Sequence, residues 1–180
     1  MNNTSQKIIW TIGHSTRTQE HFINMLQSFS IKMLINIRTY PGSSRYPHFN
    51  KENLEIVLPE NNIGYIHLKS LGGRRQSKPG SKNTSWKNAA FRGYADYMET
   101  NEFKNAIQEL EAIAIKQRTA YMCSEAVWWR CHRSMVSDYL KANGWTVYHI
   151  MEIEKSTEHT YTKPTKIIDG QLSYEERTLL

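Results

Sequence analysis

The sequence predicts a single three-layer α/β domain over residues 1–151, with a mostly parallel sheet of about five strands and helices on both faces. Five short apolar runs are typical of buried strands, and segments with apolar residues at helical spacing alternate with them. Such alternation is typical of parallel sheets covered on both faces. The 180 residues suffice for one sizeable core, and a content of 39% hydrophobic and 22% charged residues is typical of globular proteins.

The first half of the chain contains three of the expected strands. They are residues 7–13 (KIIWTIG), 32–38 (KMLINIR) and 64–68 (GYIHL). A helix near 18–29 is predicted between the first two, because apolar residues recur there at helical spacing. A short helix stopped by Pro59 is expected before the third strand.

The second half adds two strands, at 119–123 (TAYMC) and 146–151 (TVYHIM). A helix capped by Thr100 precedes the first of these strands. A helix over 131–144, ended by an Asn-Gly pair, follows it. Residues 152–180 are an extension whose structure the pattern does not predict.

Positive charge is concentrated in the first half. Residues 21–95 carry eleven Lys and Arg against three acidic residues, whereas the whole chain has a net charge of +6. Residues 69–92 carry seven Lys and Arg and no acid, and we expect a long basic loop there. This asymmetry suits a phosphate-bearing partner, including DNA or RNA; a charged surface that merely keeps the protein soluble is the alternative.

The cysteine content and hydropathy indicate a cytoplasmic protein with no membrane partner. No apolar run approaches the roughly 18 residues that span a bilayer. The apolar stretch at 7–13 is too short for a signal peptide. Two cysteines form a poor disulfide framework, so we expect free thiols in a reducing compartment. The oligomeric state is not predicted.

Chemically active residues follow the predicted strands where each strand ends. Ligands of open α/β sheets bind beyond the carboxyl ends of the strands, so these side chains are expected to meet at one edge. The stretches concerned are Gly13-His14-Ser15, Asn36-Ile37-Arg38, the basic loop, Cys123-Ser124-Glu125 and Cys131-His132-Arg133.

The same stretches resemble the domain of unknown function 488 family, over about residues 8–150. The motifs that carry the resemblance are Gly13-His14-Ser15, Ile37-Arg38 with Pro41, Ser44-Arg45 and Pro47, Leu71-Gly72-Gly73, Tyr94-Ala95-Asp96-Tyr97-Met98, Cys123-x-Glu125 and Cys131-His132-Arg133. The resemblance implies an intracellular α/β domain with an active site at these motifs and no established reaction. The family usually has Asp-x-Arg at the second strand end, where this chain has Asn36.

The two cysteines allow several kinds of chemistry. Cys131 is predicted in the first turn of a helix, where the helix dipole and neighbouring cations lower a thiol pKa. It is then a candidate nucleophile, with His14 or His132 as base, or else a structural capping residue. Cys123, at the end of a buried strand, is expected either to act as a small hydrophobic residue or to join Glu125, His14 and His132 among the reactive groups of the site.

A divalent metal is the alternative, with Cys123, Cys131 and His132 as candidate ligands, joined by His14 or Glu125. Adjacent residues of a helix point about 100° apart, which disfavours joint ligation by Cys131 and His132. Glu125 is expected either as general acid or base, or in a buried ion pair with an arginine.

Arginines supply the expected substrate contacts. Arg38, Arg45 and Arg133 suit a clamp for phosphate or carboxylate, with Ser15 beside them, and we expect Arg133→Ala to remove function with little loss of fold. Gly72-Gly73-Arg74-Arg75 would let backbone amides approach a phosphate. No motif for a nucleotide cofactor is present.

Aromatic residues lie among the basic ones, with Trp86 and Phe91 in the loop and Trp128 and Trp129 before the last predicted helix. They suit either base stacking or packing over the core. We therefore expect an enzyme that acts on a phosphate-containing substrate at a Cys/Glu/His/Arg pocket. A non-catalytic nucleic-acid-binding module, in which that cluster is structural, is the alternative.

Overall fold

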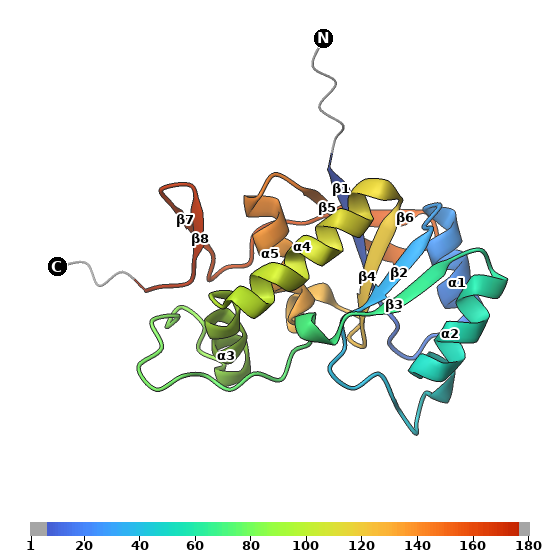
Figure 1. The fold of residues 1–180 in the computed structure, drawn as a ribbon, viewed down its shortest axis with the longest axis horizontal. Helices are drawn as coiled ribbons and strands as arrows, with labels where there is room; N and C mark the ends of the chain where they lie inside the picture. The colour runs from blue at the N-terminus through green and yellow to red at the C-terminus, as the bar shows by residue number, and fades with distance from the viewer. Residues whose placement is uncertain (1–6, 177–180) are drawn as a thin grey trace, which may run out of the picture.

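The computed structural model describes residues 7–176, and its centre is a six-stranded sheet in the order β3-β2-β4-β1-β5-β6 (Figure 1). The strands are β1 (Ile8–Gly13), β2 (Met33–Asn36), β3 (Gly64–His67), β4 (Thr119–Cys123), β5 (Thr146–Glu152) and β6 (Lys155–Glu158). The first five are parallel to their neighbours, and β6 is antiparallel to β5. The predicted α/β class is confirmed, and the sixth strand comes from the segment that the sequence pattern left unassigned.

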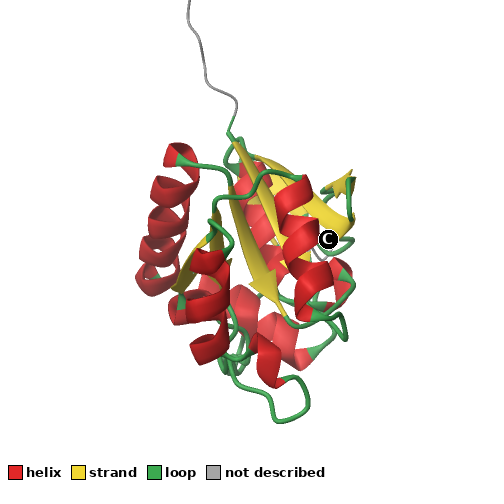
Figure 2. Cartoon of the chain, turned by 90° about the vertical axis from the view of Figure 1, so that its right-hand side faces the viewer, coloured by secondary structure: helices red, strands yellow, loops and turns green. Residues whose placement is uncertain are grey.

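Five helices cover the two faces of the sheet (Figure 2). They are α1 (Gln19–Ser28), α2 (Lys51–Glu60), α3 (Ala89–Met98), α4 (Asn101–Lys116) and α5 (Arg133–Ala142). One hydrophobic core joins one face of the sheet to α1 and α2, and the other joins the opposite face to α3, α4 and α5. Neighbouring residues of β1 belong to different cores, Ile9 to one and Trp10 to the other, as the period of two in a strand requires.

Helix ends differ from expectation at three places. Pro59 does not stop α2 but lies in its last turn, where a missing N–H costs little because it removes a single terminal bond. Helix α3 begins at Ala89, inside the predicted loop, because the side chain of Asn88 caps it. Helix α5 begins at Arg133 and not at Cys131, with His132 as its N-cap residue.

The basic loop before α3 is folded against that helix. The carboxylate of Asp96 accepts hydrogen bonds from the backbone N–H of Lys78 at 2.8 Å and from the Asn83 amide at 2.9 Å. Gly93 allows the close approach, because a Cβ there would lie 2.3 Å from the carbonyl oxygen of Arg75. The loop is therefore part of the packed domain.

The C-terminal segment is tied to α5 through one buried carboxylate. Asp138 accepts hydrogen bonds from the His159 ring at 2.9 Å, from the hydroxyls of Thr162 and Thr165, and from the Tyr174 hydroxyl at 2.9 Å. The segment ends in a hairpin of two short strands, β7 (Lys166–Ile168) and β8 (Gln171–Ser173).

A buried hydrogen-bonded chain continues from Asp138 into the sheet. His159 donates to Asp138, so its other ring nitrogen accepts from His149 at 2.9 Å, and His149 in turn accepts from the Thr11 hydroxyl at 2.7 Å. The Trp128 ring stacks on His149 with the two ring centroids 4.3 Å apart. The loop before α5 therefore rests on the same network that holds the C-terminal segment.

No helix within residues 7–176 is long and apolar enough to cross a membrane.

Replacement of Asp138 by alanine should lower the free energy of unfolding by about 3–5 kcal/mol, because several buried donors lose a charged acceptor. Urea unfolding followed by circular dichroism measures this change. Glu158→Ala is the matched control, since Glu158 also ties the C-terminal segment to α5, through an exposed pair with Lys141 at 3.3 Å. Its loss should stay below about 1 kcal/mol, and equal losses in the two variants would contradict a special role for Asp138.

His149 should make the fold sensitive to acid. Burial, together with the nearby His159 and Arg133, lowers the pKa of His149 to about 2. The unfolded chain, with a histidine pKa near 6.5, therefore binds the proton first as pH falls. Stability should fall below pH 6.5, by about 2 kcal/mol at pH 5 from this residue alone. Urea unfolding of wild type and His149→Gln at pH 7 and pH 5 measures it, and an unchanged pH dependence in the variant would refute the assignment.

Candidate functional site

A pocket of about 830 Å³ opens at the carboxyl ends of β1, β2 and β4. We call it the rim pocket; its lining residues lie within the segments 14–16, 38–46, 73–74, 90–94 and 123–132. Of the residues expected at the site, His14, Ser15, Arg38, Arg74, Cys123, Glu125, Cys131 and His132 line it, whereas Arg45, Arg75 and Arg133 do not.

The ends of β1 and β4 are held together by their backbones. The N–H of His14 donates to the carbonyl of Cys123 at 3.1 Å, and the N–H of Ser15 donates to the carbonyl of Ser124 at 2.8 Å. Gly13 makes this possible, because a Cβ at that position would lie 1.8 Å from the carbonyl oxygen of Glu125. The Gly-His-Ser motif is thus a close-approach point for the cysteine-bearing loop.

Arg38 is buried at the pocket wall and is oriented by neutral groups. The side-chain oxygen of Asn36 accepts from both the backbone N–H and the Nε of Arg38, each at 3.1 Å. Its Nη1 donates to the His14 ring at 3.1 Å, and its Nη2 donates to the carbonyl of Phe49. The side chain is 6% exposed, and within residues 7–176 it has no carboxylate partner.

His14 is held in one tautomer. Its Nδ1 lies 2.9 Å from the carbonyl oxygen of Ser15, which can only accept, so Nδ1 carries the hydrogen and Nε2 accepts from Arg38. Burial and, to a smaller extent, the charge of Arg38 lower the pKa of His14 to about 4. At neutral pH the ring is uncharged with its lone pair engaged. This arrangement favours a positioning role for His14 toward Arg38 over the role of general base.

The two cysteines and His132 form a compact group in the same pocket. The Nδ1 of His132 lies 3.6 Å from the Sγ of Cys131 and 3.9 Å from the Sγ of Cys123. Cys131 has extended backbone angles and precedes the helix, so the expected 100° divergence of Cys131 and His132 is wrong. Both side chains face the same point because one lies before the helix and the other caps it.

The two thiols differ in acidity, and in the opposite sense to the expectation. The pKa of Cys123 lies well below its usual range, because Cys131 donates a hydrogen bond to it and because the positive charge of Arg133 is close. Burial raises the pKa of Cys131 well above its usual range, and the neighbouring Cys123 raises it further. The first turn of α5 does contact this thiol, because the N–H of Arg133 donates to the Cys131 sulfur at 3.5 Å. That bond and the Arg133 charge lower the pKa of Cys131, but burial outweighs them. Both cysteines are free thiols.

A family model described as "Domain of unknown function DUF488" matches residues 18–140, more than half of the chain. The chain belongs to the DUF488 family. No curated protein and no solved structure matches it. The matched range of the DUF488 domain includes both cysteines, and the Gly13-His14-Ser15 motif lies outside it.

The structure places Glu125 and Arg133 of the DUF488 domain differently from the expectation. Glu125 is exposed at the pocket mouth, so the expected buried ion pair is wrong. Arg133 is 1% exposed and donates to two backbone carbonyls, that of Glu125 at 2.6 Å and that of Ala126 at 3.0 Å. These bonds fix the loop after β4 and leave the guanidinium outside the pocket lining.

The other three expected arginines differ in whether their side chains can reach the pocket. Arg75 lies 3.6 Å over the Tyr97 ring and donates to the carbonyls of Gly72 and Ser70, so it holds the start of the basic loop. Arg45 is exposed and stacks on Tyr46 outside the pocket lining. Arg74 is exposed at the pocket, beside the Tyr40 ring. Among these three, Arg74 alone is in position to reach a ligand in the pocket.

Sequence reasoning missed two residues of the site. Arg130 is an exposed residue of the pocket lining, and its place next to Cys131 was the available signal. Tyr94 packs edge-on against the His132 ring with centroids 5.1 Å apart, and its hydroxyl donates to the carbonyl of Leu71. The sequence signal for Tyr94 was its position in the Tyr94-Ala95-Asp96-Tyr97-Met98 motif.

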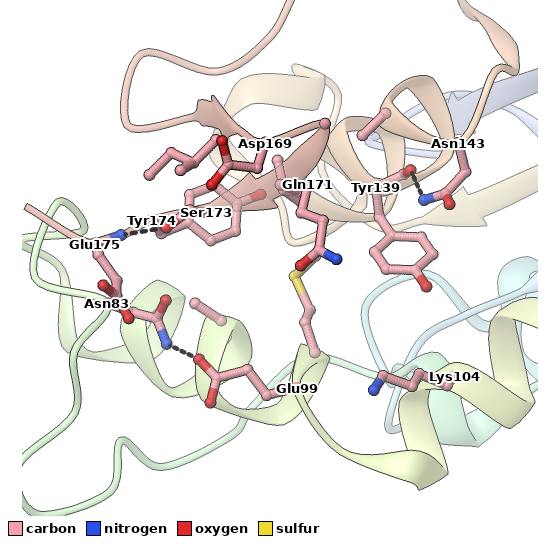
Figure 3. A pocket seen from close by; sticks show the side chains of 16 residues that line it. Asn83, Glu99, Lys104, Tyr139, Asn143, Asp169, Gln171, Ser173, Tyr174 and Glu175 are labelled. Carbon is pink, nitrogen blue, oxygen red and sulfur yellow. Dashed lines mark hydrogen bonds between the residues drawn. The ribbon is translucent and has the colours of Figure 1, made fainter.

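A second cavity of about 810 Å³ lies between the β7–β8 hairpin and the helices α3, α4 and α5 (Figure 3). It is lined by no cysteine or histidine. Its polar side chains are partly paired with one another, as Asn83 is with Glu99 at 2.7 Å. The rim pocket, which holds the imidazole and thiol groups, is therefore the candidate site of the DUF488 domain.

Arg133→Ala should destabilise the domain by about 3–5 kcal/mol, because the loop after β4 loses two charge-assisted hydrogen bonds. From the sequence alone we expected this variant to lose function with little loss of fold, and the buried hydrogen bonds of Arg133 change that expectation. The matched control is Arg130→Ala, an exposed arginine of the same segment, which should change stability by less than about 0.5 kcal/mol. Urea unfolding distinguishes the two, and an Arg133→Ala variant as stable as wild type would show that its bonds do not hold the loop.

Proposed function

We propose that this DUF488 domain is an enzyme that acts on a phosphate-containing substrate, a nucleotide or a nucleic acid, in the rim pocket. The observation that carries the proposal is the buried guanidinium of Arg38, which lines the pocket without a carboxylate partner in residues 7–176. A buried charge is costly unless it is paired, so this group favours an anionic ligand.

The surroundings of Arg38 strengthen its attraction for anions. Asn36 orients the guanidinium through a neutral amide and so leaves its charge uncancelled. Arg74 and Arg130 add two exposed guanidinium groups at the pocket mouth, against the single acid Glu125. Planar guanidinium groups match the oxygens of phosphate in geometry as well as charge.

Reactive groups lie in the same pocket as the anion-binding ones. Cys123, Cys131 and His132 line it together with Arg38, Arg74 and Arg130. Thiol and imidazole groups beside a bound substrate are the components of nucleophilic, acid–base or metal-assisted chemistry. This combination supports an enzyme over a protein that only binds.

The alternative, a non-catalytic nucleic-acid-binding module, has less support. Trp86 of the basic loop stacks on Phe91 with centroids 4.7 Å apart and packs against Tyr174. These rings therefore do not offer the free faces on which single-stranded bases stack. Lys82 of the loop is exposed and suits contact with a phosphate backbone, whereas Lys87 pairs with Glu176 at 2.8 Å, and neither lysine lines the rim pocket.

Asn36→Asp tests the anion site, because it keeps the shape of Asn36 and puts a carboxylate against Arg38. Binding of inorganic phosphate, pyrophosphate and a nucleoside monophosphate, measured by calorimetry, should weaken at least about tenfold in this variant and in Arg74→Ala and Arg130→Ala. Arg118→Ala is the control, since it removes an exposed arginine at the amino end of β4, and its affinity should match wild type. If all four variants weakened phosphate binding equally, the change in net charge would explain the effect, and the proposed anion site would be wrong.

Release of phosphate or nucleoside from a panel of phosphate mono- and diesters separates an enzyme from a binding module. Cys123→Ser should lower turnover at least about a hundredfold while phosphate binding persists. Salt-dependent binding to single-stranded RNA or DNA, with no turnover and no effect of Cys123→Ser, would establish the binding module instead.

A further inference from the structure

Three side chains of the rim pocket bring metal-binding atoms together. The Sγ atoms of Cys123 and Cys131 and a ring nitrogen of His132 all lie within 4.8 Å of one another. The two cysteines are nearly buried, and all three residues line the pocket. The group is thus enclosed on the protein side and accessible from the pocket.

The His132 ring is oriented with its free nitrogen toward the sulfurs. Its Nε2 lies 3.2 Å from the carbonyl oxygen of Ile37, which can only accept, so Nε2 carries the hydrogen. The lone pair then lies on Nδ1, the atom that faces both Sγ atoms. A ligating histidine in metalloproteins almost always donates its other N–H to a carbonyl or carboxylate in this way.

The distances match the edges of a zinc tetrahedron. Zinc binds sulfur at about 2.3 Å and imidazole nitrogen at about 2.0–2.1 Å, so adjacent S and N ligands lie about 3.5 Å apart. The two sulfur–nitrogen distances here are 3.6 and 3.9 Å. Thiolate and imidazole donors together select zinc over the hard cations magnesium and calcium, which prefer oxygen.

We propose that Cys123, Cys131 and His132 bind one zinc ion whose fourth coordination position faces the rim pocket. Three protein ligands and one open position are the arrangement of catalytic zinc sites, whereas structural sites are closed by four. The inference stands on the geometry of these three side chains and does not require that the substrate be a phosphate compound.

Gly73 leaves the space beside the ring nitrogen open. A Cβ at residue 73 would lie 2.9 Å from the Nδ1 of His132 and 3.1 Å from its Cγ. Gly73→Ala therefore displaces the ring while it keeps all three ligands. This variant separates a built site from incidental binding of zinc by free thiols.

The test measures zinc on the full chain, purified after growth with added zinc. Elemental analysis should find one zinc per chain, and the cobalt-substituted protein should show thiolate-to-metal charge-transfer absorption and tetrahedral ligand-field bands. Mutation of a group that hydrogen-bonds to a zinc ligand typically lowers zinc affinity tenfold to a hundredfold. Loss of a ligand itself should cost more, so Cys123→Ser, Cys131→Ser and His132→Gln should each lower zinc affinity at least about a hundredfold. Gly73→Ala should cost about tenfold or more. Competition with a chromophoric chelator gives these affinities.

His14→Gln is the matched control, because His14 lines the same pocket but its lone pair is engaged by Arg38, so zinc affinity should match wild type. Absence of zinc and of a cobalt spectrum in the folded wild-type protein would overturn the inference, as would His132→Gln or Gly73→Ala binding as tightly as wild type. If the folded wild-type protein binds no zinc but still binds and turns over a phosphate substrate, the zinc site is refuted and the proposed function stands. Zinc-bound protein without phosphate affinity would refute the proposed function alone.

Discussion

The candidate site depends on the buried guanidinium of Arg133. Its two hydrogen bonds hold the carbonyls of Glu125 and Ala126 against the first turn of α5. That attachment sets the course of the chain from Cys123 to Cys131, so the two thiols, eight positions apart in the sequence, lie close together. Gly13 completes the arrangement by letting β1 lie directly beneath the same loop. The chemistry of the pocket is thus positioned by an arginine that takes no part in its lining.

The fold and the gathering of most site residues could be predicted, since both follow from alternation of strands and helices and from the geometry of parallel sheets. Arg45, Arg75 and Arg133 were also expected there and do not line the pocket. The exact start of a helix and the hydrogen-bond partner of a given side chain could not be predicted. The start of α5 was misplaced because its N-cap, His132, makes no side-chain capping bond and so has no recognisable signal. One of the two expected roles of Glu125 was a buried ion pair with an arginine, but Arg133 bonds to the backbone carbonyl of Glu125, and residue types do not reveal such a choice.

Charge and ligation in the pocket are consistent with each other. Two thiolates would balance a zinc ion, and Arg38 would remain as the buried charge that an anionic ligand compensates. The neutral residues Asn36 and His14 orient Arg38 without consuming that charge. The basic loop, folded on Asp96, contributes Gly73 beside the His132 ring and Arg74 at the mouth, so one segment serves both the metal ligand and the substrate entrance.

The hydrogen-bonded chain from Asp138 to Thr11 has a consequence for where this domain ends. The family match stops at residue 140, yet β5 pairs with β1 at the middle of the sheet, and Trp128 rests on His149 of that strand. Asp138, inside the match, takes its partners from residues beyond it. A fragment trimmed to the limits of the match would lack two interior strands and leave a buried acid unpaired. The autonomous folding unit is therefore larger than the stretch by which the family is recognised.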